Sequence, residues 1–146
     1  MMPQEQEALA RRVAAQHDLD QGLVCAVVEQ ESGWNSWAMR YEPGFYDGYV
    51  PKNLPSTEAR ARAFSWGLMQ VMGQVAREHG FTGKFFTELC QPAAGLEVGC
   101  RVLKSKLDKA AGDIPKALLL WNGGARPAYA DEVVARIPKY KSGVRG

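Results

Sequence analysis

The sequence predicts a single, mainly α-helical domain over residues 1–146, and three observations lead to this expectation. The length of 146 residues is typical of one domain and long enough to bury a core without disulfide or metal support. Hydrophobic residues make up 46% and charged residues 23%, which excludes whole-chain disorder and coiled-coil arrays. Helix-capping residues and helical spacing of apolar residues then recur along most of the chain.

The expected helices follow in order from these signals. Leu9 and Val13 lie four residues apart in an amphipathic helix over 5–16. Asp20 is placed to cap the next helix, which extends from residue 21 to about residue 32 and ends at Gly33. The remaining helices are expected over 56–64 with Ser56 as cap, over 73–79 with Gly80 as stop, from Pro92 to Gly112, from the cap Asp113 to Gly123 and Gly124, and from Pro127 to Pro138.

Residues 34–55 interrupt the helical pattern. Six of the chain's 14 aromatic residues lie in this segment, among prolines and glycines and without a helical period. Loops of this length in a compact domain are usually functional or disordered, and the aromatic content argues against disorder. We therefore expect a small irregular or β-hairpin region rich in aromatic side chains.

Charge and hydropathy restrict the possible partners. A net charge of +2 is too balanced to indicate nucleic acid, and the longest apolar run, over 117–121, is far too short to span a bilayer. Residues 139–146 are expected to form a flexible basic tail. The sequence thus predicts a monomer that binds no nucleic acid and does not insert into a membrane.

The cysteines indicate neither a disulfide framework nor a metal site. Cys25, Cys90 and Cys100 cannot all pair, no Cys-x-x-Cys spacing occurs, and the two histidines are His17 and His79. We expect buried thiols that act as small hydrophobic groups, with no metal and no cofactor. The polar, acidic N-terminus lacks the features of a secretory signal, so the protein is expected to be made in the cytoplasm without a signal peptide.

Glu31 is the first candidate for catalysis. On a helix over 21–32 it follows Val24, Val27 and Val28 at helical spacing, so it lies on their apolar stripe, whereas Glu29 points to the other side. Burial there would raise the pKa of the carboxyl and suit a general acid near neutral pH. The alternative is a carboxylate at the helix end that turns into solvent, which is common.

Two further segments are weak signals when taken alone. Residues 65–70 read as an ordinary turn into a helix, and residues 120–124 read as a helix end stopped by glycine. In combination the signals are more specific. They are Glu31-Ser32, then Gly67-Leu68-Met69-Gln70, then Gly95-Leu96-Glu97-Val98-Gly99 at the opening of a helix, then Trp121-Asn122-Gly123-Gly124, and finally Tyr129.

This order and spacing resembles the lytic transglycosylase family with a soluble-transglycosylase-type, lysozyme-like catalytic domain. The resemblance covers residues from about 9 to 137, and the segment 40–46 looks more like the phage endolysin branch. It implies a lysozyme-like α-helical fold with a glycan-binding cleft and Glu31 as the single catalytic acid and base. Further implied roles are a contact of Ser32 with the N-acetyl region of the sugar, Met69 and Gln70 lining the cleft, Asn122 next to the residue that bonds the acid, and Tyr129 facing the same carboxylate.

Two positions depart from the family pattern. The family commonly has tyrosine before the asparagine, whereas this chain has Trp121, whose indole N–H can donate one hydrogen bond but accept none. Trp121 is therefore expected to reach Glu31 or the substrate through its N–H, or to leave the orienting role to Tyr129. The family also commonly has asparagine where this chain has Gly95, so a polar contact from that side chain is absent.

The implied substrate is the glycan strand of peptidoglycan. In the implied reaction Glu31 cleaves the bond between N-acetylmuramic acid and N-acetylglucosamine, an anhydro-muramic end forms, and the bacterial cell wall is lysed. Aromatic side chains of the 34–49 segment would stack on sugar faces. A site of action at the cell wall fits release through a holin-type pore or a place in the virion.

Two alternatives remain open at this point. A hydrolytic muramidase would use Glu31 with a second carboxylate about 5 Å away in a retaining enzyme, or farther in an inverting one. Candidates for that carboxylate are Glu42, Asp47 and Glu58, although exposed ion pairs with nearby arginines also explain two of them. A non-catalytic peptidoglycan-binding or virion structural module is the other alternative, and a carboxylate on a valine stripe argues against it.

Overall fold

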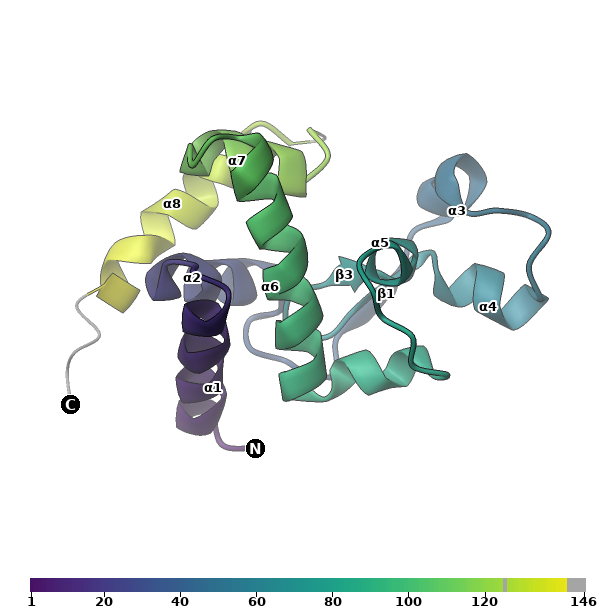
Figure 1. Ribbon diagram of the computed structural model, residues 1–146, viewed down its shortest axis with the longest axis horizontal. Coiled ribbons are helices and arrows are strands. Elements are labelled where there is room, and N and C mark those ends of the chain that lie inside the picture. The colour runs from purple at the N-terminus through teal and green to yellow at the C-terminus, as the bar shows by residue number, and fades with distance from the viewer. Residues whose placement is uncertain (125, 142–146) are drawn as a thin grey trace.

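The computed structural model describes residues 1–124 and 126–141 (Figure 1). Helices dominate the described chain, which confirms the mainly α-helical prediction. The elements are α1 (Pro3–Gln16), α2 (Gln21–Ser32), β1 (Met39–Tyr41), α3 (Pro43–Tyr49), α4 (Ser56–Ala61), β2 (Phe64–Trp66), β3 (Val71–Met72), α5 (Gly73–Glu78), the 3-10 helix η1 (Phe86–Cys90), α6 (Pro92–Lys109), α7 (Ile114–Trp121) and α8 (Ala128–Lys141).

A small antiparallel sheet lies between two groups of helices. Its strand order is β1-β2-β3, with Met39 opposite Trp66 and Trp66 opposite Val71. In Figure 1, α1, α2 and α8 lie at one end of the molecule, α3 and α4 lie at the other, and the sheet lies between them. The long helix α6 runs beside the sheet.

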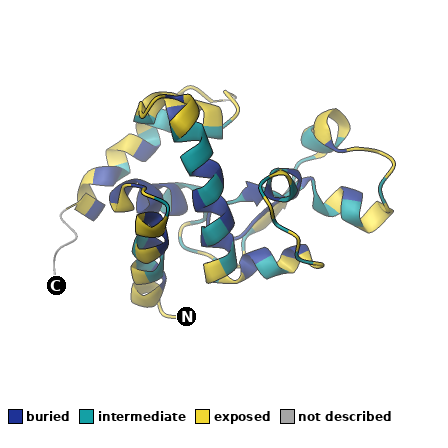
Figure 2. Cartoon of the chain, viewed as in Figure 1, coloured by how far each residue is buried: buried dark blue, intermediate teal, exposed yellow. Residues whose placement is uncertain are grey.

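Helix α2 is the most buried element. Residues 22–28 are all buried, because their side chains are apolar around the whole helix and α1 and α8 pack against it. The dark blue ribbon of α2 in Figure 2 shows this burial. The C-terminal turn of α2, which carries Glu31, therefore starts from a helix that its neighbours hold firmly.

The predicted caps of two helices are confirmed. Oδ1 of Asp20 accepts a hydrogen bond from the Leu23 amide at 3.0 Å, and Oδ1 of Asp113 accepts one from the Lys116 amide at 3.0 Å. Helix α2 ends at Gly33, whose left-handed φ of 58° is the usual conformation of a helix C-terminus.

The prediction that Pro138 ends the last helix is wrong. Helix α8 continues through Pro138 to Lys141, so residues 139–141 are helical, while 142–146 lie outside the described residues. Tyr140 is buried in the core, and its carbonyl accepts a hydrogen bond from Arg11 at 3.0 Å. These tertiary contacts hold the helix past the proline, although proline gives up one backbone hydrogen bond.

The aromatic segment is more regular than the sequence indicates. It contains β1 and α3. Residues 41–63, which we call the small lobe, form a second, smaller core. The members of that core are Val50, Ala59 and Ala63, with Tyr41, Phe45, Tyr46 and Leu54 packed against them.

Helix α4 is shorter than expected and begins differently. Its cap position is Pro55 without a side-chain hydrogen bond, so Ser56 is the first helical residue and not the cap. It ends at Ala61, because Phe64 leaves the helix to pair with Tyr41 in the sheet.

The backbone carbonyl of Leu89, in η1, explains two glycines. A Cβ atom at Gly67 would lie 2.3 Å from that oxygen, and one at Gly95 would lie 2.6 Å from it. Neither position has room for a side chain, and Gly67 also has a left-handed φ of 75°. The absence of an asparagine at position 95 therefore has a steric reason.

The three cysteines are free and buried, as predicted. Burial raises the pKa of the Cys25 and Cys100 thiols to about 12. At neutral pH they are un-ionised and act as small apolar groups of the core.

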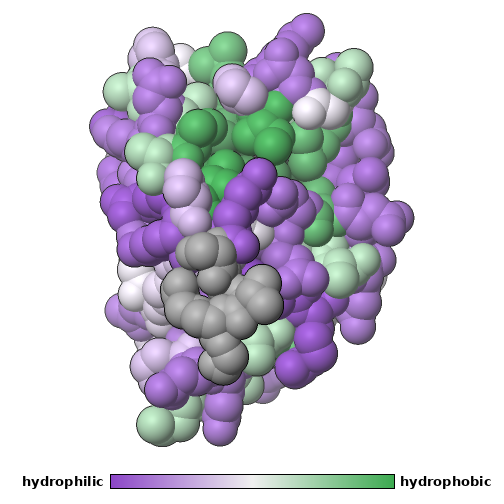
Figure 3. All heavy atoms as spheres, turned by 90° about the vertical axis from the view of Figure 1, so that its left-hand side faces the viewer, coloured by the Kyte–Doolittle hydropathy of each residue, from purple (hydrophilic) through white to green (hydrophobic). Residues whose placement is uncertain are grey.

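The end of the molecule near α8 presents a mostly hydrophilic face with an apolar area in its upper part (Figure 3). The large apolar side chains that α7 and α8 leave exposed are Leu119, Leu120 and Val134. In the apolar run over 117–121, Ala117 and Leu118 are thus buried in the core, whereas Leu119 and Leu120 are exposed. Among the described residues, no helix combines the length and the hydrophobicity needed to cross a membrane.

Candidate active site

Glu31 lies in the last turn of α2, on the side that the valine stripe predicts. Its carboxylate is partly buried and contacts side chains of α7 and α8. The alternative in which the side chain turns into solvent is therefore wrong for this residue.

Two donors converge on one oxygen of Glu31. The indole N–H of Trp121, at the end of α7, donates to Oε2 at 3.2 Å, and the hydroxyl of Tyr129, in the first turn of α8, donates to the same atom. The hydrogen bond expected from the indole is thus present beside that from the tyrosine. Because Oε2 is held in this way, Oε1 is the oxygen left to meet another group.

The environment raises the pKa of Glu31. Burial has the largest effect and disfavours the carboxylate, while the hydrogen bonds from Tyr129 and Trp121 and the charge of Arg40 oppose it. Burial also raises the pKa of Tyr129, and the neighbouring carboxylate adds to this effect, so Tyr129 remains a neutral donor. Glu31 is therefore an acid that stays protonated to a higher pH than an ordinary glutamate.

Arg40 is a charged residue whose influence on Glu31 the sequence did not reveal. It lies on β1, its side chain is 75% exposed, and its Nε pairs with Glu42 at 3.3 Å. Its position in an exposed aromatic segment suggested only the local ion pair. The folding of β1 beside the 67–70 turn is what brings its charge near Glu31.

Ser32 connects the end of α2 to the turn over 67–70. Its hydroxyl is within donating distance of two backbone carbonyls, that of Leu68 at 2.7 Å and that of Val28 at 3.1 Å. The oxygen lone pairs of the hydroxyl remain able to accept a hydrogen bond. The Glu31-Ser32 motif and the 67–70 turn are therefore neighbours in the fold.

Gln70 holds the same turn from inside. Its backbone has a left-handed φ of 52°, and its amide nitrogen donates to the carbonyls of Ala38 at 3.0 Å and Gly67 at 2.9 Å. Its amide oxygen accepts a hydrogen bond from Ser65 at 2.8 Å. These contacts give Gln70 a structural role in shaping the turn.

The expectation that Met69 lines the cleft needs correction. Its side chain is fully buried and packs against Gly99, where an added Cβ atom would lie 2.3 Å from its sulfur. The side chain therefore supports the turn from the core and does not face a ligand. Asn122 is partly exposed, follows Trp121 as the C-cap of α7, and donates to the Arg126 carbonyl at 3.3 Å.

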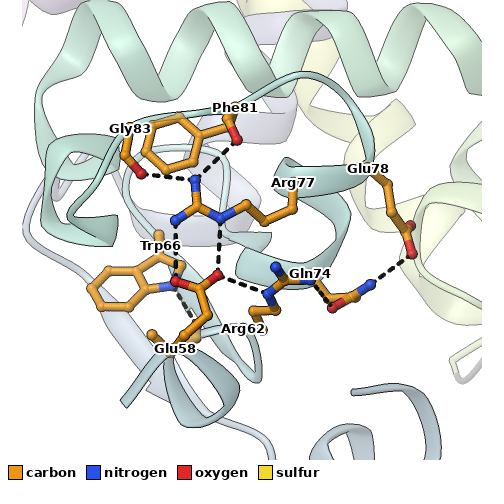
Figure 4. Close-up of polar contacts among 9 residues, drawn as sticks. Glu58, Arg62, Trp66, Gln74, Arg77, Glu78, Phe81 and Gly83 are labelled. Atoms are coloured by element: carbon orange, nitrogen blue, oxygen red, sulfur yellow. Dashed lines mark hydrogen bonds and ion pairs between the residues drawn. The ribbon is translucent and has the colours of Figure 1, made fainter. Parts of the chain in front are cut away.

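Two of the three candidate second carboxylates, Glu42 and Glu58, pair with arginines. Glu58 pairs with Arg62 at 2.8 Å and with Arg77 at 3.0 Å, and these contacts lower its pKa (Figure 4). Glu42 pairs with Arg40, and Asp47 is exposed on α3. The pairs that the sequence suggested between Glu42 and Arg40 and between Glu58 and Arg62 are confirmed. Arg60, the other suggested partner of Glu58, instead donates to the Tyr41 hydroxyl, and Arg77 is an additional partner of Glu58.

The aromatic residues of the 34–49 segment divide into two groups. Four of them are partly buried, and Tyr46 lies under both Lys52 and Arg60 at 4.4 Å. Trp37 and Tyr49 are 77% and 71% exposed. Trp37 is next to Ala38, whose carbonyl accepts hydrogen bonds from Gly67 and Gln70, so it lies beside the turn near Glu31.

Other sites are weaker candidates for chemistry. A surface hollow of about 400 Å³ is lined by Asp18, Leu107 and Ile114, and one of about 210 Å³ by Trp66, Phe85 and Phe86; Glu31 lines neither. Within residues 1–124 and 126–141, no group of three or more histidine, cysteine, aspartate or glutamate side chains could hold a metal ion.

Comparison with known proteins agrees with this geometry. The family model described as the transglycosylase SLT domain matches residues 8–133, which include Glu31, the 67–70 turn, Trp121 and Tyr129. No solved structure matches the chain. The enzymes of this family are lytic transglycosylases that act on peptidoglycan. The chain belongs to the transglycosylase SLT domain family.

Proposed function

We propose that the whole chain is one catalytic domain that cleaves the bond between N-acetylmuramic acid and N-acetylglucosamine and leaves anhydro-muramic ends. The observation that supports this most is the arrangement around Glu31. A single carboxylate with a raised pKa has one oxygen held by Trp121 and Tyr129, while its other oxygen accepts no hydrogen bond from the described residues. One such group can serve as acid and then as base, because it gives a proton to the leaving oxygen and then takes another from the hydroxyl that closes the ring.

The proton of neutral Glu31 belongs on Oε1, since Oε2 already accepts two hydrogen bonds. From Oε1 it passes to the glycosidic oxygen as the bond to the leaving sugar breaks. The acetamido oxygen of the muramic residue stabilises the positive charge that develops on its ring. Partial burial of Glu31 supports this role, because burial raises the pKa of the carboxyl toward neutral pH and an acid is most effective when its pKa lies near the working pH.

The same carboxylate then works as a base. It removes the proton from the primary hydroxyl of the muramic residue, and the oxygen of that hydroxyl bonds to the anomeric carbon. The anhydro ring closes, Glu31 is protonated again, and no water is consumed. A hydrolytic muramidase would require a second carboxylate, and the pairing of Glu42 and Glu58 with arginines supports the reaction without one.

Contacts with the sugar are proposed for residues around Glu31. The lone pairs of the Ser32 hydroxyl would accept the acetamido N–H, and Trp37 would stack on a sugar face. Gln70 and Asn122 would contribute at the edges of the site, where both are partly exposed. Met69 would act indirectly, by supporting the 67–70 turn from the core.

The biological consequence that we propose is bacteriolysis by a monomeric enzyme. The resemblance of residues 40–46 to the phage endolysin branch supports release through a holin-type pore or a place in the virion. Production of the protein inside bacteria, with and without a pore-forming holin, tests the first route. Lysis that requires the holin supports it, and lysis without any pore contradicts it.

The experiment that tests the catalytic role is Glu31→Gln, which keeps the shape of the side chain and removes the proton donor. General acid and base catalysis contributes about 10²–10⁴-fold, so clearance of purified sacculi should fall by at least about 10²-fold. Asp47→Asn, which removes an exposed carboxylate of the small lobe, is the control and should retain the rate. A folded Glu31→Gln protein with near-normal activity would overturn the proposal.

A further inference from the structure

Glu29 is joined to α8 on the side of α2 opposite Glu31. Its carboxylate, 16% exposed, pairs with Arg136, accepts a hydrogen bond from the Tyr140 hydroxyl at 2.5 Å, and pairs with Lys139 at 2.7 Å. All three partners belong to α8. These contacts hold the pKa of Glu29 below its usual range, so it is a carboxylate at neutral pH.

Trp34 joins the other flank of Glu31 to the same helix. It follows Gly33, and both residues have left-handed backbones, with φ values of 58° and 68°. A tryptophan rarely adopts this conformation, so other contacts must hold it there. Its indole N–H donates to the Tyr140 hydroxyl at 3.1 Å, and the two rings lie 6.3 Å apart.

The Tyr140 hydroxyl is therefore the centre of a clamp. It accepts a hydrogen bond from Trp34, three residues after Glu31, and donates one to Glu29, two residues before it. Tyr129, which bonds Glu31, lies on the same helix as Tyr140. The clamp thus fixes the C-terminal turn of α2 against the helix that supplies the donor to the catalytic carboxylate.

We infer that Glu29, Trp34 and Tyr140, together called the α2–α8 clamp, are positioning residues that set the hydrogen bond between Tyr129 and Glu31. This inference rests on the proposed role of Glu31 as acid and base. None of the three touches Glu31 in the contacts described, so they act through the relative placement of the two helices. A loosened clamp would leave the fold intact and let the Tyr129 hydroxyl move away from Oε2.

A second ion-pair group serves as a matched control. Glu97, on α6, bonds His17 at 3.0 Å and Arg101 at 2.9 Å, and it joins α6 to the residue that follows α1. Like Glu29, it is a partly buried glutamate with a cationic partner on its own or a neighbouring helix. Within the described residues it forms no hydrogen bond or ion pair with α8, so its loss should affect stability without affecting Glu31.

The experiment is a double-mutant cycle on the rate of glycan cleavage, measured well below the melting temperature of each variant. Tyr140→Phe keeps the ring and removes the hydroxyl, and it should lower the rate about tenfold. In a Tyr129→Phe background the same change should lower the rate less than about twofold, because the hydrogen bond it sets is already absent. Glu97→Gln should have the same small effect in both backgrounds.

Equal losses for Tyr140→Phe in both backgrounds, or a lower melting temperature with an unchanged rate, would overturn the inference. If Tyr140→Phe does not fold, Trp34→Phe removes the indole donor alone and enters the same cycle, with the same two outcomes. Failure of the proposed function would be recognised by a different result. Activity in Glu31→Gln would remove Glu31 from the chemistry, whereas an inactive Glu31→Gln with additive clamp variants would refute the clamp alone.

Discussion

The hydroxyl of Tyr129 donates a hydrogen bond to Oε2 of Glu31, although the two residues lie 98 positions apart in the sequence. Trp121 donates to the same oxygen, so α7 and α8 both meet one atom at the end of α2. In the proposed reaction, this asymmetry leaves Oε1 to act on the substrate. The predictions below test what each donor, and the carboxyl itself, contributes.

Trp121→Phe should lower activity with little effect on folding. The change keeps most of the ring packing and deletes the N–H that reaches Oε2 at 3.2 Å. A hydrogen bond to a charged or reacting group is worth about 1.5–3 kcal/mol, so the rate should fall about 10–100-fold. Rate and melting temperature are measured on the same preparation.

Trp66→Phe is the matched control for this change. Its indole N–H donates to the Ala61 carbonyl at 3.0 Å and, in the described structure, makes no hydrogen bond to Glu31. It should lower the melting temperature and leave the rate unchanged. If Trp121→Phe behaves in the same way, Trp121 is a packing residue and the orienting role passes to Tyr129.

Tyr129→Phe should move the alkaline limb of the pH–rate profile to higher pH. The groups that oppose the raised pKa of Glu31 are Tyr129 on α8, Trp121 on α7 and Arg40 on β1. Loss of the Tyr129 donor removes stabilisation of the carboxylate, so the pKa of Glu31 rises further. Because protonated Glu31 starts the reaction that we propose, activity should persist to higher pH while the maximal rate falls. An alkaline limb that stays in place would contradict this coupling.

Glu31→Gln should change how stability depends on pH. The folded protein raises the pKa of Glu31 above its unfolded value, so its contribution to stability is full at low pH and declines as pH rises through the folded pKa. The amide side chain of the variant cannot ionise, so this decline is absent from it. Thermal melting of both proteins between about pH 4 and pH 9 should show the variant gaining stability relative to the natural protein as pH rises. Parallel curves would show that Glu31 is not desolvated.

Trp37→Ala should weaken glycan binding without loss of stability. The side chain is 77% exposed, and substitutions at such positions usually change stability by less than about 0.5 kcal/mol. Loss of an aromatic anchor should weaken binding to purified glycan strands about tenfold. Trp37→Tyr keeps a flat aromatic face and should bind nearly as well. Equal binding by the alanine variant would remove Trp37 from the substrate contacts.

The sequence predicts the helical framework where local chemistry decides the structure. Asp20 and Asp113 are predictable caps, because an aspartate before a helical pattern can accept a hydrogen bond from a free backbone amide of the first turn. The orientation of Glu31 is predictable from its helical spacing to three valines. Pro138 misleads for the opposite reason. Its local tendency to end a helix is overridden by the burial of Tyr140, which only the tertiary structure reveals.

The site could be predicted only in part for the same physical reason. The order of the motifs indicates that Glu31, Trp121 and Tyr129 belong together, but not that both donors share Oε2. The resemblance suggests that Met69 lines the cleft, whereas its side chain is buried against Gly99. This burial depends on the close approach of α6 to the 67–70 turn, which the sequence does not reveal. The partners of Glu29 on α8 carry no local signal, because more than 100 residues separate it from each of them.

The most direct test of the account is mass spectrometry of the fragments that the enzyme releases from purified sacculi. The reaction proposed for Glu31 consumes no water, so the primary products should carry anhydro-muramic ends, one water lighter than hydrolytic ends. Glu31→Gln should release neither kind. Reducing muramic ends in the primary product would contradict the account and would show that a second group, with Glu42, Asp47 and Glu58 as the first to be mutated, assists Glu31 in hydrolysis.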